Sequence, residues 1–286
     1  MDSDIITGMN KEDYFIDCFS KSPFIGDDAA VIEAGKLKNL CVSQDAFFEN
    51  VHFRRDWMSL YQIAKKAMLV NISDAVVMNA KPRYALLTVA IPKDYSRSEL
   101  KELARGFQDA ADKYGITIIG GDTIANIKLD ISVTIMAECE KPVRRSGMRE
   151  GDLLAYTGDP GGSLRDLGRL LRGGSVNGRS RFIEPVLRER FFYEAASSIR
   201  CAMDISDGLF RDLEKLHRAN GLGFEFFRPI PKRVGCSGEE FEILFAFDPA
   251  KESRILNIAK KTRTPVTIFA RAVKKPYIDI CKANHF

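Results

Sequence analysis

Strand-like and helix-like segments alternate along this chain, and the alternation is the strongest constraint on its fold. Lys81-Pro82 ends a long apolar helical segment. An amphipathic helical segment follows; Ser96 or Ser98 opens it, and Gly115 closes it. The expected helices cover residues 60–80 and 96–115, and the expected strands cover 38–47, 84–92, 116–123 and 129–139. This pattern predicts an α/β fold in which helices and sheets form layers.

A glycine-rich, polar stretch around residues 138–150 separates this half from a second α/β pattern. In the second pattern, strands are expected at 152–158 and 241–247, and helices at 163–174, 184–199 and 208–220. A chain of 286 residues exceeds the usual size of one domain. We therefore expect two domains, residues 1–140 and 141–286.

Composition excludes several classes of protein. No apolar run approaches the roughly 20 residues that span a bilayer, and the acidic start does not resemble a signal peptide, so we expect a cytoplasmic protein without membrane contact. A net charge of +4 with dispersed basic residues argues against nucleic-acid binding. Six cysteines without a C-x-x-C pair indicate neither a zinc site nor a disulfide framework, and we expect them to be reduced and mostly packed.

Seven aspartates lie within apolar runs or at their ends: Asp27, Asp28, Asp45, Asp74, Asp122, Asp204 and Asp207. Burial of an unpaired carboxylate costs several kcal/mol, and no matching set of lysines or arginines lies close in sequence. Divalent cations would neutralise these acids. Ligation by oxygen atoms alone indicates magnesium. Calcium is the alternative, although the sequence contains no EF-hand loop. Glycines beside the acids would let a phosphate approach the backbone, although P-loop and Rossmann signatures are absent.

Simpler explanations exist for the same residues. Ser206 or Asp207 could cap the helix that follows, and the Ile-Ser-Asp sequence recurs at 72–74. The Gly120-Gly121-Asp122 segment could be a plain turn, and Asp27 and Asp28 could be solvated loop acids. "TGDPGG" at 157–162 could hold an anion at a helix start, but we favour a tight turn.

Seven motifs together resemble the thiamine-monophosphate kinase family, within a superfamily that includes aminoimidazole ribonucleotide synthetase and selenophosphate synthetase. They are "GDDAAV" (26–31), "SQDAFFENVHF" (43–53), "KAMLVNISDAVVMNAKP" (66–82), "GGDT" (120–123), "RSGMREGD" (145–152), "MDISDGL" (203–209) and "SGEEFEILF" (237–245). The resemblance implies transfer of the ATP γ-phosphate to thiamine monophosphate. It also implies an N-terminal mixed sheet with helices that pairs across a homodimer, and a C-terminal α/β domain.

The resemblance assigns roles by motif. It implies several magnesium ions, shared between both domains, on Asp28, Ser43, Gln44, Asp45, Asp74, Asp122, Asp204 and Asp207. It implies ATP contacts at Gly121, Asp122, Arg145 and Ser206. His52 and Glu239 would contact thiamine monophosphate. Glu240 is the alternative to Glu239 if the motif aligns one residue later, and His52 could instead be a half-buried side chain with only a packing role. The acceptor phosphate is already anionic, so no general base or covalent nucleophile is assigned.

Two departures from the family pattern concern the substrate. The segment between Gly221 and Glu239 is short, and Ala283 replaces an aromatic residue in a "GYDHF"-like ending. Another aromatic residue would have to contact the thiamine rings; the candidates are Trp57, Tyr277 and Phe286. The alternatives are another synthetase of the superfamily, resembling the aminoimidazole ribonucleotide or selenophosphate enzyme, and a non-enzymatic divalent-cation-binding protein. The motif "ENVHF" disfavours a synthetase that resembles the aminoimidazole ribonucleotide enzyme. The lack of a reactive Cys and Lys near the N-terminus disfavours one that resembles the selenophosphate enzyme.

Overall fold

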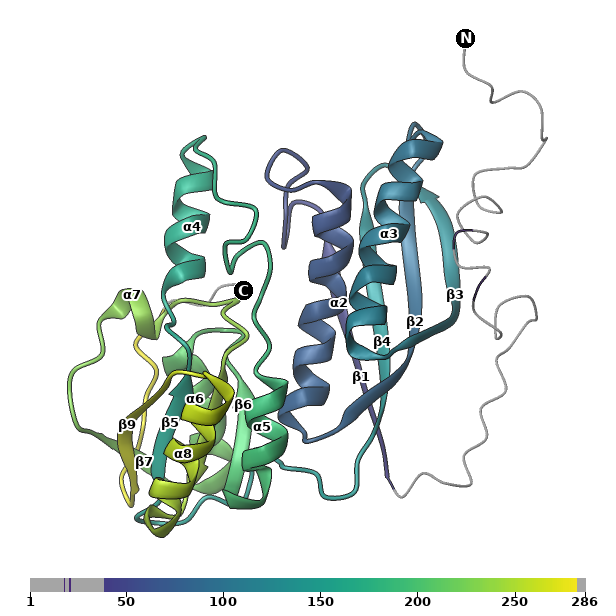
Figure 1. The fold of residues 1–286 in the computed structure, drawn as a ribbon. Coiled ribbons are helices and arrows are strands. Elements are labelled where there is room, and N and C mark those ends of the chain that lie inside the picture. The colour runs from purple at the N-terminus through teal and green to yellow at the C-terminus, as the bar shows by residue number, and fades with distance from the viewer. Residues whose placement is uncertain (1–17, 19–20, 22–38, 282–286) are drawn as a thin grey trace. The chain divides into compact units, whose positions relative to one another are not determined.

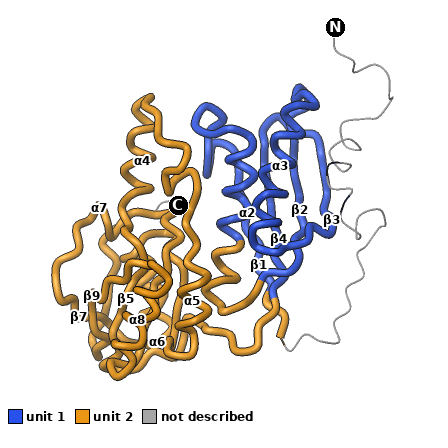
Figure 2. The backbone as a smooth tube through the Cα atoms, in the orientation of Figure 1, with its two compact units in different colours: residues 1–37, 42–71, 82–137 blue, residues 38–41, 72–81, 138–286 orange. Residues whose placement is uncertain are grey.

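The computed structural model describes residues 18, 21 and 39–281. This part of the chain forms two compact units (Figure 2). Unit 1 contains residues 42–71 and 82–137, and unit 2 contains residues 39–41, 72–81 and 138–281. Both units combine a sheet with helices, so the predicted α/β class is confirmed. The division into domains at residue 140 stays a prediction.

Unit 1 is built on a four-stranded sheet with the order β1-β4-β2-β3. Its elements are β1 (Leu40–Phe48), α2 (Leu60–Val77), β2 (Lys81–Pro92), α3 (Arg97–Tyr114), β3 (Thr117–Asn126) and β4 (Asp130–Glu138). The end of α2, from Ile72 onward, belongs to unit 2, as do single terminal residues of β2 and β4 and the first two residues of β1. The parallel neighbours β2 and β3 are joined by α3. Figure 1 shows α2 and α3 in front of the sheet, and alternate residues of β4 are buried. The strands β1 and β3 form the two edges of this sheet.

The ends of α3 follow the predicted signals. The Ser96 backbone N–H donates to Glu99 at 2.8 Å, and the Glu99 N–H donates to Ser96 Oγ at 3.3 Å, which completes a capping box. Gly115 ends the helix in the left-handed conformation with φ of 66°. Local sequence therefore determines both boundaries of this helix.

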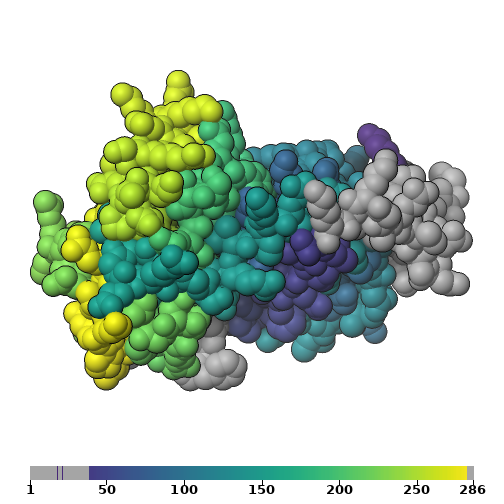
Figure 3. Space-filling view, turned by 90° about the horizontal axis from the view of Figure 1, so that it is seen from below, coloured from purple at the N-terminus to yellow at the C-terminus, as the bar shows by residue number. Residues whose placement is uncertain are grey.

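Unit 2 contains a five-stranded sheet with the order β6-β8-β5-β9-β7, whose neighbouring strands are antiparallel. Its strands are β5 (Leu153–Thr157), β6 (Ile199–Asp204), β7 (Gly223–Phe226), β8 (Ile243–Phe247) and β9 (Val266–Val273). Its helices are α4 (Gly162–Leu171), α5 (Glu189–Ala195), α6 (Leu209–Asn220), α7 (Lys232–Gly235) and α8 (Glu252–Thr262), with short 3-10 turns η1 (Ala196–Ser198) and η2 (Pro249–Lys251). Every residue of β8 is buried, whereas most of α8 is exposed at the surface (yellow-green in Figure 3).

The helix expected over 184–199 is wrong in its length. Only Glu189–Ala195 is α-helical, followed by η1, and β6 begins at Ile199. Pro185 explains why Glu184 lies outside the helix, because a proline disfavours a helical conformation in the residue before it. Nothing in the local sequence explains why residues 186–188 also lie outside it. No helix in the part of the chain that the structure describes is long and apolar enough to cross a membrane.

The expectation that the cysteines are reduced is wrong for one pair. Cys236 and Cys281 form a disulfide across a sequence separation of 45, with Cα atoms 5.6 Å apart. That distance lies in the range a disulfide requires, but it depends on tertiary folding and leaves no spacing signal in the sequence. Cys139 and Cys201 are buried and free, as expected.

Candidate active site

The end of α2 and the end of β6 meet in unit 2, and each carries an Ile-Ser-Asp sequence at or next to the contact, at 72–74 and 205–207. The strand β6 ends at Asp204, which is only 3% exposed. Its Oδ2 accepts a hydrogen bond from Ser73 Oγ at 2.8 Å. Ser73 is also buried, near the end of α2, and Asp74 follows it with partial exposure. The shared sequence therefore marks two segments that meet within unit 2.

The simpler explanation that Ser206 or Asp207 caps α6 is wrong. The N-cap is Gly208, and no side chain caps the helix. Gly208 has φ of 109°, and a Cβ atom there would lie 3.2 Å from the backbone of Cys236, so glycine is required. Asp207 instead accepts a hydrogen bond from Lys215 Nζ at 2.6 Å. The expectation that the aspartates lack a basic partner nearby in sequence is therefore wrong for Asp207.

A further acid in this loop region escaped sequence analysis. Asp212 is fully buried; its Oδ1 accepts from Lys215 Nζ at 2.7 Å, and its Oδ2 accepts from the Asp207 N–H at 3.2 Å. Burial raises the pKa of Asp212 to about 7, although the Lys215 ammonium lowers it and Asp204 and Asp207 raise it further. Its position three residues after Leu209, on the apolar face of the helix, was an available signal.

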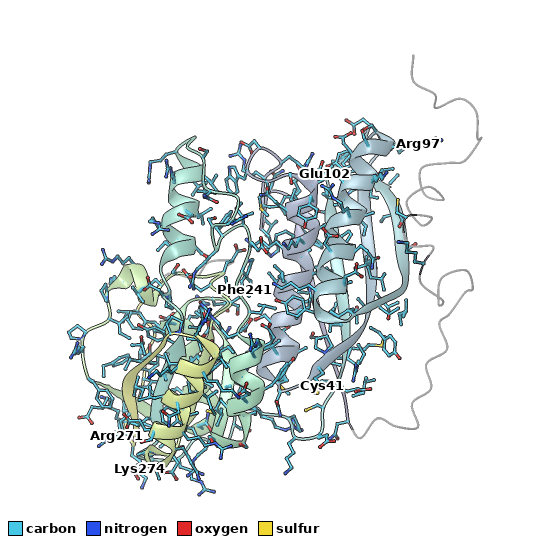
Figure 4. All side chains as sticks on the ribbon, in the orientation of Figure 1. Cys41, Arg97, Glu102, Phe241, Arg271 and Lys274 are labelled. Atoms are coloured by element: carbon cyan, nitrogen blue, oxygen red, sulfur yellow. A yellow bond between two sulfur atoms is a disulfide. The ribbon has the colours of Figure 1, made fainter. Side chains whose placement is uncertain are left out.

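The "SGEEFE" segment folds directly onto this loop. The Glu239 N–H donates to the Ser206 carbonyl at 2.7 Å, and the Phe241 N–H donates to the Ile205 carbonyl at 2.9 Å. Glu239 and Phe241 have φ of 54° and 51°, which is uncommon for residues other than glycine. Figure 4 labels Phe241 in this loop before β8. The structure thus places the predicted substrate residue Glu239 beside the predicted ATP residue Ser206.

Glu240 has a structural role that differs from that of Glu239. It is buried, and its Oε1 accepts hydrogen bonds from the backbone of Gly161 at 2.7 Å, the backbone of Ser163 at 3.0 Å and Ser237 Oγ at 2.5 Å. The first turn of α4 therefore holds a carboxylate of the chain itself. The "TGDPGG" segment is the turn we favoured, and its helix start already has an anion.

Glu242 is the third glutamate of the segment and is also buried. Arg181 and Arg188 both form ion pairs with it, Arg188 Nη2 at 2.7 Å, and Thr157 Oγ1 donates to it at 2.6 Å. These partners lie 54 to 85 residues away, so no local pattern predicts them. Of the three glutamates, Glu239 alone is partly exposed and accessible to a ligand.

In unit 1, one buried asparagine holds the predicted ligands of β1. Asn71 Oδ1 accepts a hydrogen bond from the Asp45 backbone N–H at 2.8 Å, and its carbonyl accepts from Ser43 Oγ at 3.5 Å. Gln44 Nε2 donates to Ser132 on the neighbouring strand at 3.0 Å. Asn71 was not among the predicted site residues, although it lies three residues before Asp74 on the same helix.

Asp122 and Gly121 lie on β3, at the opposite edge of the same sheet. The Oδ1 atom of Asp122 accepts a hydrogen bond from the Thr123 N–H at 3.0 Å, and Asp122 is exposed. A Cβ atom at Gly121 would lie 1.7 Å from the Leu87 carbonyl oxygen, so the close packing of β2 against β3 requires glycine there. Two strands separate β3 from β1, which corresponds to about 14 Å. The structure therefore does not bring Asp122 together with Asp45.

His52 is held in one orientation. Its Nδ1 accepts a hydrogen bond from the Phe48 N–H at 3.0 Å, and its ring stacks on Phe47 with centroids 5.5 Å apart. In the neutral ring this contact leaves the proton on Nε2. The side chain is half-buried, so it combines the packing role with a fixed N–H donor.

The two predicted ATP contacts of unit 2 lie at opposite ends of α6. Ser206 precedes its first turn, whereas the carbonyl of Arg145 accepts a hydrogen bond at 2.9 Å from Asn220, the last residue of the helix. A helix of 12 residues is about 18 Å long. Arg145 itself is exposed.

Two of the aromatic candidates lie in the described part of the chain. The Tyr277 hydroxyl donates to the Phe210 carbonyl at 3.0 Å, and its ring packs on Phe224 in the core of unit 2. Trp57 is half-buried under the Arg54 guanidinium, 5.4 Å from its ring centroid. The other predicted positions lie outside the described residues; they are Asp27, Asp28, Ala283 and Phe286.

The predicted metal ligands offer carboxylate, hydroxyl and amide oxygens, the donor types that magnesium prefers. Asp204 supplies carboxylate oxygens of this type, and it is buried and accepts a hydrogen bond from a hydroxyl. Among the described residues, no group of three or more His, Cys, Asp or Glu side chains has the arrangement of a metal site.

Solved structures share this fold. A thiamine-monophosphate kinase from Stenotrophomonas maltophilia K279a has a TM-score of 0.82 at 23% identity, covering 93% of both chains. AaThiL complexed with AMPPCP and TMP has a TM-score of 0.74 at 25% identity, covering 90% of this chain and 88% of that one. The hydrogenase maturation protein HypE of E. coli has a TM-score of 0.77 at 17% identity, covering 92% and 89%.

The chain is also similar in sequence to known proteins. Residues 26–139 match the family described as AIR synthase related protein, N-terminal domain. The thiamine-monophosphate kinase of Rhodopirellula baltica is 33% identical over 258 residues, which cover 81% of this chain and 78% of the relative. That of Bacillus subtilis is 33% identical over 215 residues, covering 70% and 66%. The identity and coverage of the first of these relatives show that the chain belongs to the thiamine-monophosphate kinase family.

Proposed function

We propose that this protein transfers the γ-phosphate of ATP to thiamine monophosphate and so forms thiamine diphosphate and ADP. The observation that carries this proposal is the 33% identity to a thiamine-monophosphate kinase over 81% of the chain. The related AaThiL was solved with AMPPCP and TMP, and shares the fold. The contact of Ser73 with Asp204 and of Glu239 with Ser206 supports the same function, because it joins motifs that the family resemblance had linked.

Magnesium is the metal that we propose for this reaction. Asp74, Asp204 and Asp207 would bind it in unit 2, and the candidates in unit 1 are Ser43, Gln44, Asp45 and Asp122. Asp28 belongs to the same proposal. Bound magnesium ions would neutralise the repulsion between two phosphorylated substrates and stabilise the charge of the transition state.

The remaining residues would bind and orient the substrates. His52 presents a fixed Nε2–H, and Glu239 offers a carboxylate to the positively charged thiazolium ring of thiamine. Ser206, Gly121 and Arg145 are proposed ATP contacts, with Arg145 supplying a planar fork for phosphate oxygens. The acceptor phosphate needs no proton removed, so catalysis would depend on position and charge.

We also propose a homodimer, because both edges of the sheet in unit 1 carry exposed apolar side chains. Val42 and Phe48 on β1 are 58% and 39% exposed, and Ile124 on β3 is 52% exposed. Unpaired, apolar strand edges favour association with another chain. Val42→Lys should shift the mass measured by light scattering toward the monomer, while Leu171→Lys, at an exposed site on α4, should not. Cytoplasmic localisation stays a prediction of the sequence.

A coupled assay tests the activity directly. The protein, incubated with ATP, thiamine monophosphate and excess Mg²⁺, should form thiamine diphosphate and ADP in equal amounts, and EDTA should stop the reaction. Binding of Mg²⁺ without turnover would instead support the cation-binding alternative. Turnover of ATP only with another acceptor would support a different member of the superfamily.

A further inference from the structure

Unit 2 contains a large cavity, and none of the residues proposed for the reaction lines it. Its volume is about 1120 Å³, and it is formed by the turn before α4, one side of α4, the segment after α4, and α7. The charged residues that line it are Asp159, Arg165, Asp166, Arg169, Arg179, Arg181 and Arg233. Five arginines against two aspartates give the lining a net positive charge.

Two of these arginines have acidic partners. Arg165 forms an ion pair with Asp166 at 3.1 Å, and Arg181 forms one with the buried Glu242. Glu242 also binds Arg188, so the Arg181 side of the cavity is anchored to the core of the unit. One wall of the cavity is therefore held in place before any ligand binds.

The other three arginines have no carboxylate within ion-pair distance among the described residues; they are Arg169, Arg179 and Arg233. Like charges that line one cavity repel each other, and an anion between them would relieve this repulsion. In addition, Ser180 Oγ is buried in the cavity lining and has no hydrogen-bond partner in the structure. A hydroxyl in that state is costly unless a ligand or water satisfies it.

The start of α4 does not supply this site, because Glu240 already accepts hydrogen bonds from the backbone of Gly161 and Ser163 at 2.7 and 3.0 Å. The guanidinium groups would bind the anion instead. Arginine presents two parallel N–H donors that match phosphate oxygens, and several arginines favour a ligand with more than one phosphate group.

The cavity also has apolar lining and is larger than a diphosphate group alone requires. Pro160, Val176 and Val234 line it, and Leu164, 41% exposed, lies there as well. Pockets of this size usually take a ligand with an organic part. We infer that this cavity binds an organic molecule that carries two or more phosphate groups, through Arg169, Arg179 and Arg233.

Calorimetric titration with ADP, thiamine diphosphate and pyrophosphate, in EDTA and at low salt, tests this inference. Without magnesium the aspartates proposed as metal ligands repel these anions, which weakens binding at the proposed kinase site, and the arginine variants then assign the remaining binding to the cavity. The wild-type protein should bind ADP or thiamine diphosphate more tightly than pyrophosphate, and the tighter of the two identifies the organic part. Arg169→Gln with Arg179→Gln should weaken that binding about tenfold or more.

Matched variants separate this site from general charge and from the proposed kinase site. Arg172→Gln changes an exposed arginine at the end of α4 that does not line the cavity, and it should leave the affinity within about twofold. Asp74→Asn should also keep the affinity while it removes kinase turnover. The inference is overturned if none of the three compounds binds in EDTA, or if Arg172→Gln weakens binding as much as the double variant.

Discussion

Two acidic loops of unit 2 contact each other through backbone hydrogen bonds, but their carboxylates have different partners. In the loop 237–242, Glu242 binds two arginines and Glu240 binds two backbone N–H groups and a hydroxyl. In the region 204–215, Lys215 lies between Asp207 and Asp212, and Asp204 accepts from the hydroxyl of Ser73. The two glutamates, and with them Asp207 and Asp212, are thus held by basic or backbone donors of the chain. The donor to Asp204 is a neutral hydroxyl, which suits the metal-binding role that we propose for it.

This difference shows how similar acids can serve structure in one place and chemistry in another. A buried carboxylate that binds several donors of its own chain is a structural element, because those donors would lose their partner if it moved. Replacing Glu242 should therefore affect the free energy of unfolding more than turnover, and replacing Asp204 should affect turnover more than the free energy of unfolding.

The largest effect should come from Asp204→Asn. The amide keeps an acceptor for Ser73 Oγ but loses the charge proposed to bind magnesium, so kcat for thiamine diphosphate formation should fall about a thousandfold or more. Thermal unfolding should show a folded protein with a Tm close to that of the wild type. Near-normal turnover in this variant would remove Asp204 from the proposed metal site.

Glu242→Gln should instead lower stability. The change leaves Arg181 and Arg188 close to a neutral group in the interior, and breaking such a pair costs about 3–5 kcal/mol. Urea unfolding measures the free energy of unfolding directly. Glu214→Gln is the control, because its pair with Arg218 is largely exposed and should contribute less than about 1 kcal/mol. Equal effects in the two variants would contradict a structural role for Glu242.

The two serines of the repeated Ile-Ser-Asp segment provide a closer test. Ser73→Ala removes a hydroxyl from a buried carboxylate and should cost about 1–3 kcal/mol of stability. Ser206 contacts Glu239 through its backbone carbonyl, so Ser206→Ala should leave stability nearly unchanged and alter the KM for ATP. Comparison of urea midpoints decides this; a larger loss in Ser206→Ala would mean that the second segment, not the first, supports the loop.

Local signals in the sequence predicted part of this arrangement. Ser96 and Gly115 mark the ends of α3 because capping depends on residues within one turn. The position of Asp204 beside an apolar run singled it out as a metal ligand, and that role stays a prediction. Partners distant in sequence escaped prediction; the Cys236–Cys281 disulfide and the arginines around Glu242 depend on which strands become neighbours. The same limit applies to Asp122, whose place on the edge opposite β1 depends on strand order.

The smallest effect concerns pH and Glu240. Burial raises the pKa of this carboxyl, although its hydrogen bonds to Ser237, Gly161 and Ser163 oppose the shift. The folded state therefore retains the proton to a higher pH than the unfolded state, whose pKa is near 4.5. Stability from this group is fully present below that value and decreases as the pH rises through the folded pKa.

Glu240→Gln should remove this dependence, because the amide keeps an acceptor oxygen for the start of α4 and does not titrate. Urea unfolding across mildly acidic to neutral pH should show that the wild type loses stability relative to Glu240→Gln as the pH rises. Glu252→Gln, on the surface of α8, should keep the wild-type profile. If the free energy of unfolding changes with pH in the same way in the wild type and in Glu240→Gln, the pKa of Glu240 is the same in the folded and unfolded states. The hydrogen bonds from the start of α4 would then offset the full effect of burial on that pKa.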